Sequence, residues 1–97
     1  MIQEGKKNIA NDPSRLRWAC RRGMLELDLL LGAFLDNQYP LLNDFLKYQF
    51  VDLLAAPDPQ LFDWLFGQAE SEETNDLIDI IRAIRTYAVS RFQVKAL

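Results

Sequence analysis

The chain has 97 residues, 49% of them hydrophobic, with a formal net charge of −3 and no histidine. This length suits one domain, and the lack of histidine removes the commonest general base and nearly every transition-metal site. The single cysteine, Cys20, excludes an internal disulfide and any multi-cysteine metal site. We therefore expect no catalytic residue, no cofactor and no metal.

The first helix is expected to follow a flexible lead-in. Residues 1–11 show no periodicity, which leaves 12–97 as a single helical domain. Asp12-Pro13 marks the helix start, with the aspartate as N-cap and the proline at the first helical position. The helix is expected to run to about Arg22, where Gly23 can break or bend it. Its buried stripe is Leu16, Ala19 and Cys20, and a second, basic and aromatic face is made by Arg15, Trp18 and Arg22.

Three more helices are expected between residues 24 and 67. One covers about Met24 to Gln38, and the next begins after the N-cap Asn43 and ends at Ala55-Ala56-Pro57. Asp58-Pro59 repeats the cap-plus-proline signal and opens a short helix that stops at Gly67. The first two of these helices have apolar stripes at helical spacing, formed by Leu27, Leu30, Leu31, Phe34, Leu46, Phe50, Leu53 and Leu54.

The last helix is expected to start at Ser71, because Glu72 and Glu73 favour the positive end of a helix. Its core face is formed by Leu77, Ile80, Ile81, Ile84 and Ala88. No segment alternates with period two for long enough to form a strand. The fold class is therefore all-α, a small compact bundle of about five helices.

One stretch, residues 15–28, concentrates arginines, a tryptophan and a glycine at a junction between two helices. Arginine and tryptophan are enriched at interface hot spots, which indicates a protein-binding site. Two interpretations stay open for each residue: Trp18 packs in the core or contacts a partner, and Gly23 is a plain helix C-cap or lets a partner approach closely. Arg22 and Glu26 form either a surface ion pair or a unit in which Glu26 orients the arginine at an interface.

The same stretch carries a recognisable motif. Arg22-Gly23-Met24-Leu25-Glu26 reads as R-G-x-x-E within a longer block from Trp18 to Asp28, and the segment from Asp58 to Leu65 reads as D-P-x-L-F-x-W-L. Together, at this spacing, the two blocks resemble the family of succinate dehydrogenase assembly factors, bacterial and mitochondrial, which promote covalent attachment of FAD to the flavoprotein subunit. The resemblance extends from about Ser14 to Arg85.

The resemblance implies a five-helix bundle that is not an enzyme. It implies a protein that binds the flavoprotein subunit of succinate dehydrogenase, with that of fumarate reductase as a second candidate, and promotes its flavinylation. The partner-binding residues that it implies are Arg22, Gly23 and Glu26 in the motif, flanked by Trp18, Arg21, Met24 and Asp28. Arg22 would then contact carboxylates or carbonyls of the partner. Direct binding of FAD is a further alternative, but the sequence contains no nucleotide-binding motif, so no cofactor-binding residue is named.

Two alternatives come from other classes of function. Some members of the family have been labelled antitoxins, so a protein that neutralises a small toxin by binding is the second hypothesis. A small RNA-binding bundle is the third, although residues 27–81 carry a balance of −10 against +3 for residues 1–26. No apolar run approaches the ~20 residues of a membrane span, and no signal-peptide stretch appears in residues 1–12. We therefore expect a cytoplasmic protein that does not insert into membranes. We also expect a monomer.

Overall fold

The computed structural model describes residues 2–67 and 76–92. Within these ranges the chain is helical, with short 3-10 segments and no strand, so the all-α fold class is confirmed. The elements in order are α1 (Ile2–Ala10), α2 (Pro13–Ala19), α3 (Leu25–Asn37), the 3-10 turn η1 (Tyr39–Leu41), α4 (Asp44–Leu54), α5 (Asp58–Phe66) and α6 (Ile78–Phe92).

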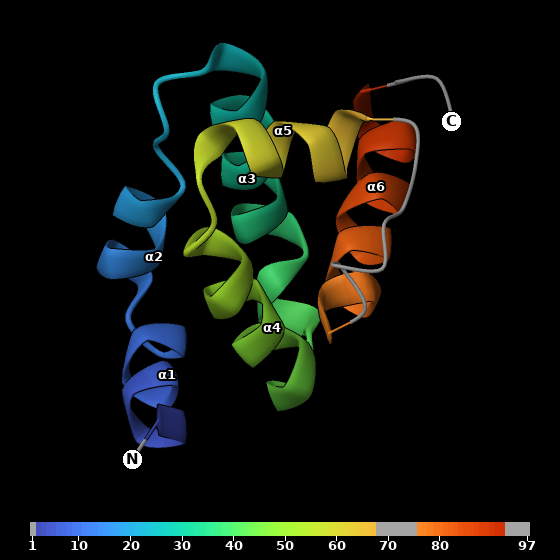
Figure 1. The fold of residues 1–97 in the computed structure, drawn as a ribbon. Helices are drawn as coiled ribbons and strands as arrows, with labels where there is room; N and C mark the ends of the chain where they lie inside the picture. The colour runs from blue at the N-terminus through green and yellow to red at the C-terminus, as the bar shows by residue number, and fades with distance from the viewer. Residues whose placement is uncertain (1, 68–75, 93–97) are drawn as a thin grey trace.

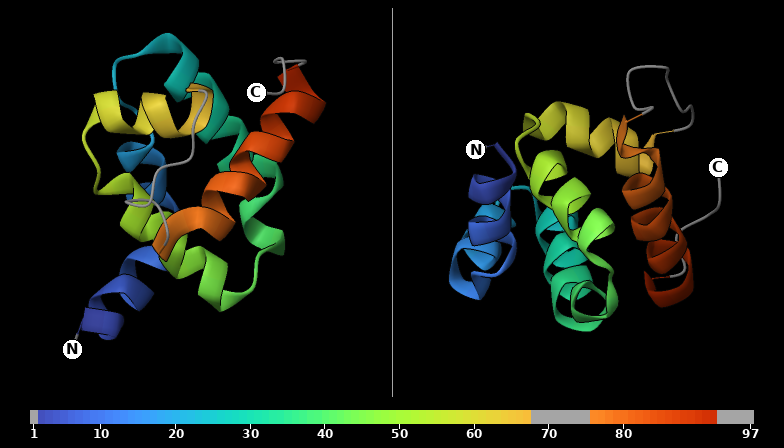
Figure 2. Two further views of the ribbon diagram at one scale, coloured as in Figure 1. Left: turned by 45° about the vertical axis from the view of Figure 1, so that its right-hand side comes forward. Right: turned by 90° about the horizontal axis from the view of Figure 1, so that it is seen from below.

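Helices α3 and α4 lie in the middle of the bundle (Figure 1). Helix α2 packs on α3 at one side, with α1 against α2 and α4, and α6 packs on α3 and α4 at the other side. The short α5 crosses one end of the bundle from the end of α4 to α6, as the three views agree (Figures 1 and 2). The connection between α2 and α3 lies at this same end.

The core forms where the predicted apolar stripes meet. Phe34 of α3 stacks on Phe50 of α4 with ring centroids 5.6 Å apart, and Tyr39 of η1 lies 5.3 Å from the Phe50 ring. From α6, the predicted face contributes Ile80, Ile81, Ile84 and Ala88, all buried, with Leu77 packed beside them. Cys20 is 2% exposed, and its burial raises the pKa of the thiol to about 12.

Helix α1 is where the structure departs most from the expectation. The expected flexible lead-in at 1–11 is instead helical over Ile2–Ala10. Two contacts and the burial of Ala10 account for this. Lys6 Nζ lies 2.9 Å from Asp52 Oδ2, and the Tyr39 hydroxyl donates to the Ala10 carbonyl at 2.6 Å. Because these contacts are tertiary, local periodicity does not predict the helix.

The predicted helix ends hold in most places. Asp12 and Asn43 accept hydrogen bonds from Arg15 N and Leu46 N as N-caps. Helix α2 ends at Ala19 instead of Arg22. The predicted N-cap role of Asp58 is wrong, because the N-cap of α5 is Pro57 and Asp58 is the first helical residue. The predicted start at Ser71 lies outside the described residues.

No helix in the described part of the chain has the length and apolar character needed to cross a membrane.

Candidate partner-binding site

The connection between α2 and α3, residues 20–24, is shaped by Gly23 and Asp28. Gly23 has φ +84°, a conformation that L side chains rarely adopt. The Asp28 carboxylate on α3 accepts hydrogen bonds from the backbone N–H of Arg22 at 2.6 Å and from that of Gly23 at 3.3 Å. Met24, the N-cap of α3, makes no side-chain cap, and Asp28 in the first turn of α3 binds N–H groups of the preceding loop. The loop is therefore held in one shape.

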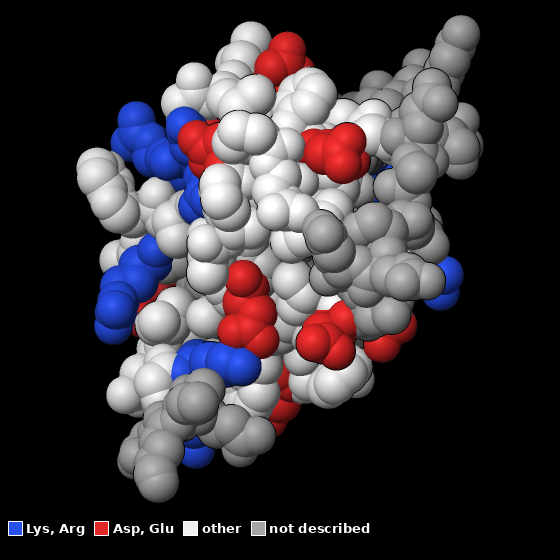
Figure 3. Space-filling view, viewed as in Figure 1, with Lys and Arg blue, Asp and Glu red and all other residues white. Residues whose placement is uncertain are grey.

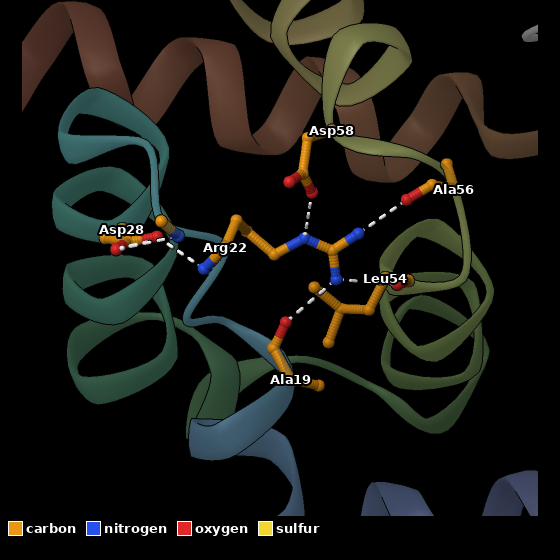
Figure 4. Close-up of polar contacts among 7 residues, drawn as sticks. Ala19, Arg22, Asp28, Leu54, Ala56 and Asp58 are labelled. Atoms are coloured by element: carbon orange, nitrogen blue, oxygen red, sulfur yellow. Dashed lines mark hydrogen bonds and ion pairs between the residues drawn. The ribbon is translucent and has the colours of Figure 1, made fainter.

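The Arg22 side chain points back into the protein (Figure 4). It is 14% exposed, and its Nε donates to Asp58 Oδ1 at 2.8 Å. Its Nη1 donates to the carbonyl oxygens of Ala19 and Leu54, each at 3.0 Å, and its Nη2 to that of Ala56 at 2.5 Å. The guanidinium thus joins the end of α2 to the connection between α4 and α5.

This geometry corrects the predicted role of Arg22. The arginine was expected to face a partner and to pair with Glu26, but it makes four hydrogen bonds within the chain. Glu26 is exposed and pairs with no residue that the structure describes. The true partner, Asp58, is 36 positions away in sequence, so helical spacing carries no sign of it.

Trp18 and Arg21 point outward. Trp18 is 74% exposed, so the interpretation of a core residue is wrong. The Arg21 guanidinium carbon lies 5.7 Å from the centre of the Trp18 ring, within cation–π distance. Of the remaining predicted site residues, Gly23 is exposed and Met24 is half-buried and packs against the core.

Two leucines of α3 extend this exposed surface and were missed by the sequence analysis. Leu25 is 69% exposed and Leu29 is 56% exposed, and their i, i+4 spacing places them on one face of the helix. Asp36, further along this face, pairs with Arg17 of α2. Their position in the sequence could have revealed this exposure, because both leucines lie off the predicted inward stripe of the helix.

We name the exposed residues of this region the α2–α3 surface: Trp18, Arg21, Gly23, Leu25, Glu26 and Leu29. Its composition, aromatic and aliphatic groups with an arginine and a glutamate, is typical of a protein-binding surface. Figure 3 shows that lysine and arginine side chains gather at the left of the molecule, over α1 and α2, whereas acidic side chains lie over the middle of this face.

The described residues offer no cluster of three His, Cys, Asp or Glu side chains that could hold a metal. Because the pKa of the Cys20 thiol is raised to about 12, the thiol stays protonated at neutral pH and is a poor nucleophile.

Comparison with known proteins agrees with the motif resemblance. Residues 14–88 match the family model described as flavinator of succinate dehydrogenase. The chain is 43% identical to FAD assembly factor SdhE of Idiomarina loihiensis, over 86% of this chain and 87% of the relative. It is also 43% identical to the protein of that name in Pectobacterium atrosepticum, covering 78% and 85% of the two chains. It is 46% identical to the protein of that name in Legionella pneumophila, over 76% of this chain and 91% of the relative.

Proposed function

Because this chain belongs to the flavinator family of succinate dehydrogenase, we propose that it is an assembly factor that binds the flavoprotein subunit of that enzyme and promotes the covalent attachment of FAD. The observation that carries the proposal is the α2–α3 surface, where the exposed Trp18 lies beside Arg21 of a loop whose backbone is bonded to Asp28. The protein acts in the cytoplasm as a monomer, and the flavoprotein subunit of fumarate reductase is its second client.

The proposed mechanism is binding without a catalytic group from this chain. Holding flavin and acceptor aligned in the client can in principle contribute about 7–11 kcal/mol through proximity and orientation. Trp18 supplies contact area, Arg21 binds a client carboxylate, and Glu26 accepts a hydrogen bond from a client donor. Gly23 lets the client backbone approach, since open space surrounds it within 4 Å.

Arg22 and Asp28 have a different role in this proposal. Both are partner-binding residues only indirectly, because their side chains bond within the chain and hold the loop that carries Gly23. Met24, packed against the core, supports the same loop.

The two other classes of function have less support. The relatives compared above carry an FAD assembly factor name, and no observation favours a toxin as partner. For RNA binding, Arg22 contributes little to a basic patch because it is mostly buried, and Arg17 is paired with Asp36. A pull-down that recovers a small toxin or an RNA in place of a flavoprotein would favour the corresponding alternative over the assembly factor.

The first prediction tests the surface in cells. In cells lacking this gene, wild type should restore flavin fluorescence of the denatured flavoprotein band, and Trp18→Ala should restore it poorly. Truncation of an exposed aromatic hot-spot residue costs about 2 kcal/mol or more of binding, so the purified variant should bind the client roughly thirtyfold more weakly.

The matched control is Phe45→Ala, which removes another exposed aromatic ring (59% exposed) from the first turn of α4, outside the α2–α3 surface. It should behave as wild type. Equal loss in both variants would contradict the location of the site, and unchanged covalent flavin in cells without the gene would contradict the function.

A further inference from the structure

The two sequence motifs of this chain meet at one ion pair. Arg22 of the R-G-x-x-E motif donates from Nε to Asp58, which opens the D-P-x-L-F segment at the start of α5. The two side chains are 14% and 37% exposed, so the pair is partly shielded from solvent. An arginine–carboxylate hydrogen bond in such a place is stronger and less screened by salt than a bond on the open surface.

The other donors of Arg22 bind carbonyl groups at two helix ends. Ala19 is the last residue of α2 and Leu54 the last residue of α4, and the carbonyl groups of a final helical turn lack partners within the helix. A cation at such an end is also favoured by the helix dipole. Because the guanidinium is planar, a partner that fixes Nε also fixes the direction of the two Nη groups. Asp58 therefore orients all of these contacts.

The orientation of Arg22 reaches the α2–α3 surface through the backbone. Gly23 follows Arg22 directly, and both backbone N–H groups bond to Asp28. The Arg22 side chain is thus held on one side of the loop and its main chain on the other. Asp58 is therefore linked to the loop through Arg22, although Asp58 itself lies on another helix.

We propose that Asp58 is a positioning residue for partner binding: it orients Arg22, and through Arg22 it fixes the Gly23 loop in the conformation that the client recognises. This proposal rests on the proposed function, because the client is assigned there. It adds that the D-P-x-L-F segment serves the same site as the R-G-x-x-E motif.

Asp44 provides the matched control. It is the first residue of α4 as Asp58 is of α5, so both carboxylates favour the positive end of a helix. Asp44 is exposed and has no ion pair with a described residue. Asp44→Ala therefore removes the interaction with the helix end and a charge near the Tyr39 hydroxyl but no partner of Arg22, whereas Asp58→Ala removes the interaction with the helix end and the partner of Arg22.

The experiment compares Asp58→Ala, Asp58→Asn and Asp44→Ala at a temperature where each variant is folded. Two quantities are measured: the hydrogen exchange and chemical shift of the Gly23 amide in the free protein, and the affinity for the purified flavoprotein subunit. Asp58→Ala should speed Gly23 exchange and weaken client binding about tenfold or more. Asp58→Asn keeps an oxygen acceptor in place, so its values should fall between those of wild type and Asp58→Ala. Asp44→Ala should match wild type in both Gly23 exchange and client affinity.

The outcomes separate the two proposals. Should Asp58→Ala leave the Gly23 amide and the client affinity unchanged, the positioning role is overturned. The same conclusion follows if Asp44→Ala weakens client binding as much as Asp58→Ala does. If wild type itself does not bind the flavoprotein, the proposed function fails, while a Gly23 amide that responds to Asp58→Ala still supports the positioning of the loop. Where the alanine variant does not fold, the asparagine variant decides.

Discussion

Gly23 and Gly32 differ in what the backbone requires of them. Open space surrounds both, since a Cβ added at either position would meet no atom within 4 Å. Only Gly23 has a positive φ, +84°, whereas Gly32 lies within the regular helix α3. A side chain is therefore strained at Gly23 by the backbone and not by its neighbours.

This contrast gives a prediction for stability. Gly23→Ala should lower the free energy of unfolding by about 1 kcal/mol, because a left-handed conformation costs an L-residue about that much. Gly32→Ala should raise it by about 0.5–1 kcal/mol, because alanine loses less backbone entropy in a helix. Urea unfolding of the two variants beside wild type measures both shifts. A loss of stability in Gly32→Ala would contradict the assignment of open helical space around it.

At the level of single residues, the identity of the site was predictable and its geometry was not. The R-G-x-x-E motif located the loop, and a glycine at the helix junction agreed with its positive φ. Whether Trp18 is exposed depends on which helices flank α2, and its own spacing on α2 did not decide this. Leu25 and Leu29 were missed because leucine is ordinarily a core residue, and only the assembled bundle leaves them exposed.

At the scale of elements, the helices marked by local signals were predictable. Asp12-Pro13 and Asn43 carry their caps within the first turn, so the sequence alone located α2 and α4. Helix α1 has no such signal. It depends on contacts with Asp52 and Tyr39, which lie on α4 and η1.

Tyr39→Phe tests this dependence of α1. The variant leaves the buried Ala10 carbonyl without its hydroxyl donor, so we expect a loss of about 1 kcal/mol in the free energy of unfolding. Amide exchange should become faster in α1 before it does so in α3 or α4. Tyr48→Phe on α4 is the control, because that hydroxyl has no hydrogen bond to a described residue. Uniform acceleration along the chain would contradict a local role for Tyr39.

At the scale of the whole molecule, two buried groups make the free energy of unfolding decrease at alkaline pH. Burial, the largest cause for both, raises the pKa of the Cys20 thiol from 9.0 and of the Tyr39 hydroxyl from 10.0, each to about 12. Above pH 9 the unfolded chain releases these protons while the folded chain retains them. Stability is therefore fully present below pH 9 and is lost progressively as the pH rises towards 12.

The measurement is the midpoint of urea unfolding at two pH values. At about pH 8 both groups are protonated in the unfolded chain, and at about pH 10.5 they are largely deprotonated there. The midpoint of wild type should fall between the two pH values. The double variant Cys20→Ala, Tyr39→Phe should show a smaller fall, although its midpoint at the lower pH is itself reduced. Equal falls in the two proteins would show that other groups cause the alkaline effect.

The contacts of Arg22 have a consequence for how the chain becomes active during its synthesis. Its partners at Leu54, Ala56 and Asp58 follow it by 32 to 36 positions. A growing chain therefore exposes the complete R-G-x-x-E sequence well before the groups that shape it exist. The shape of this loop therefore depends on groups that are present only once the chain has been synthesised as far as α5.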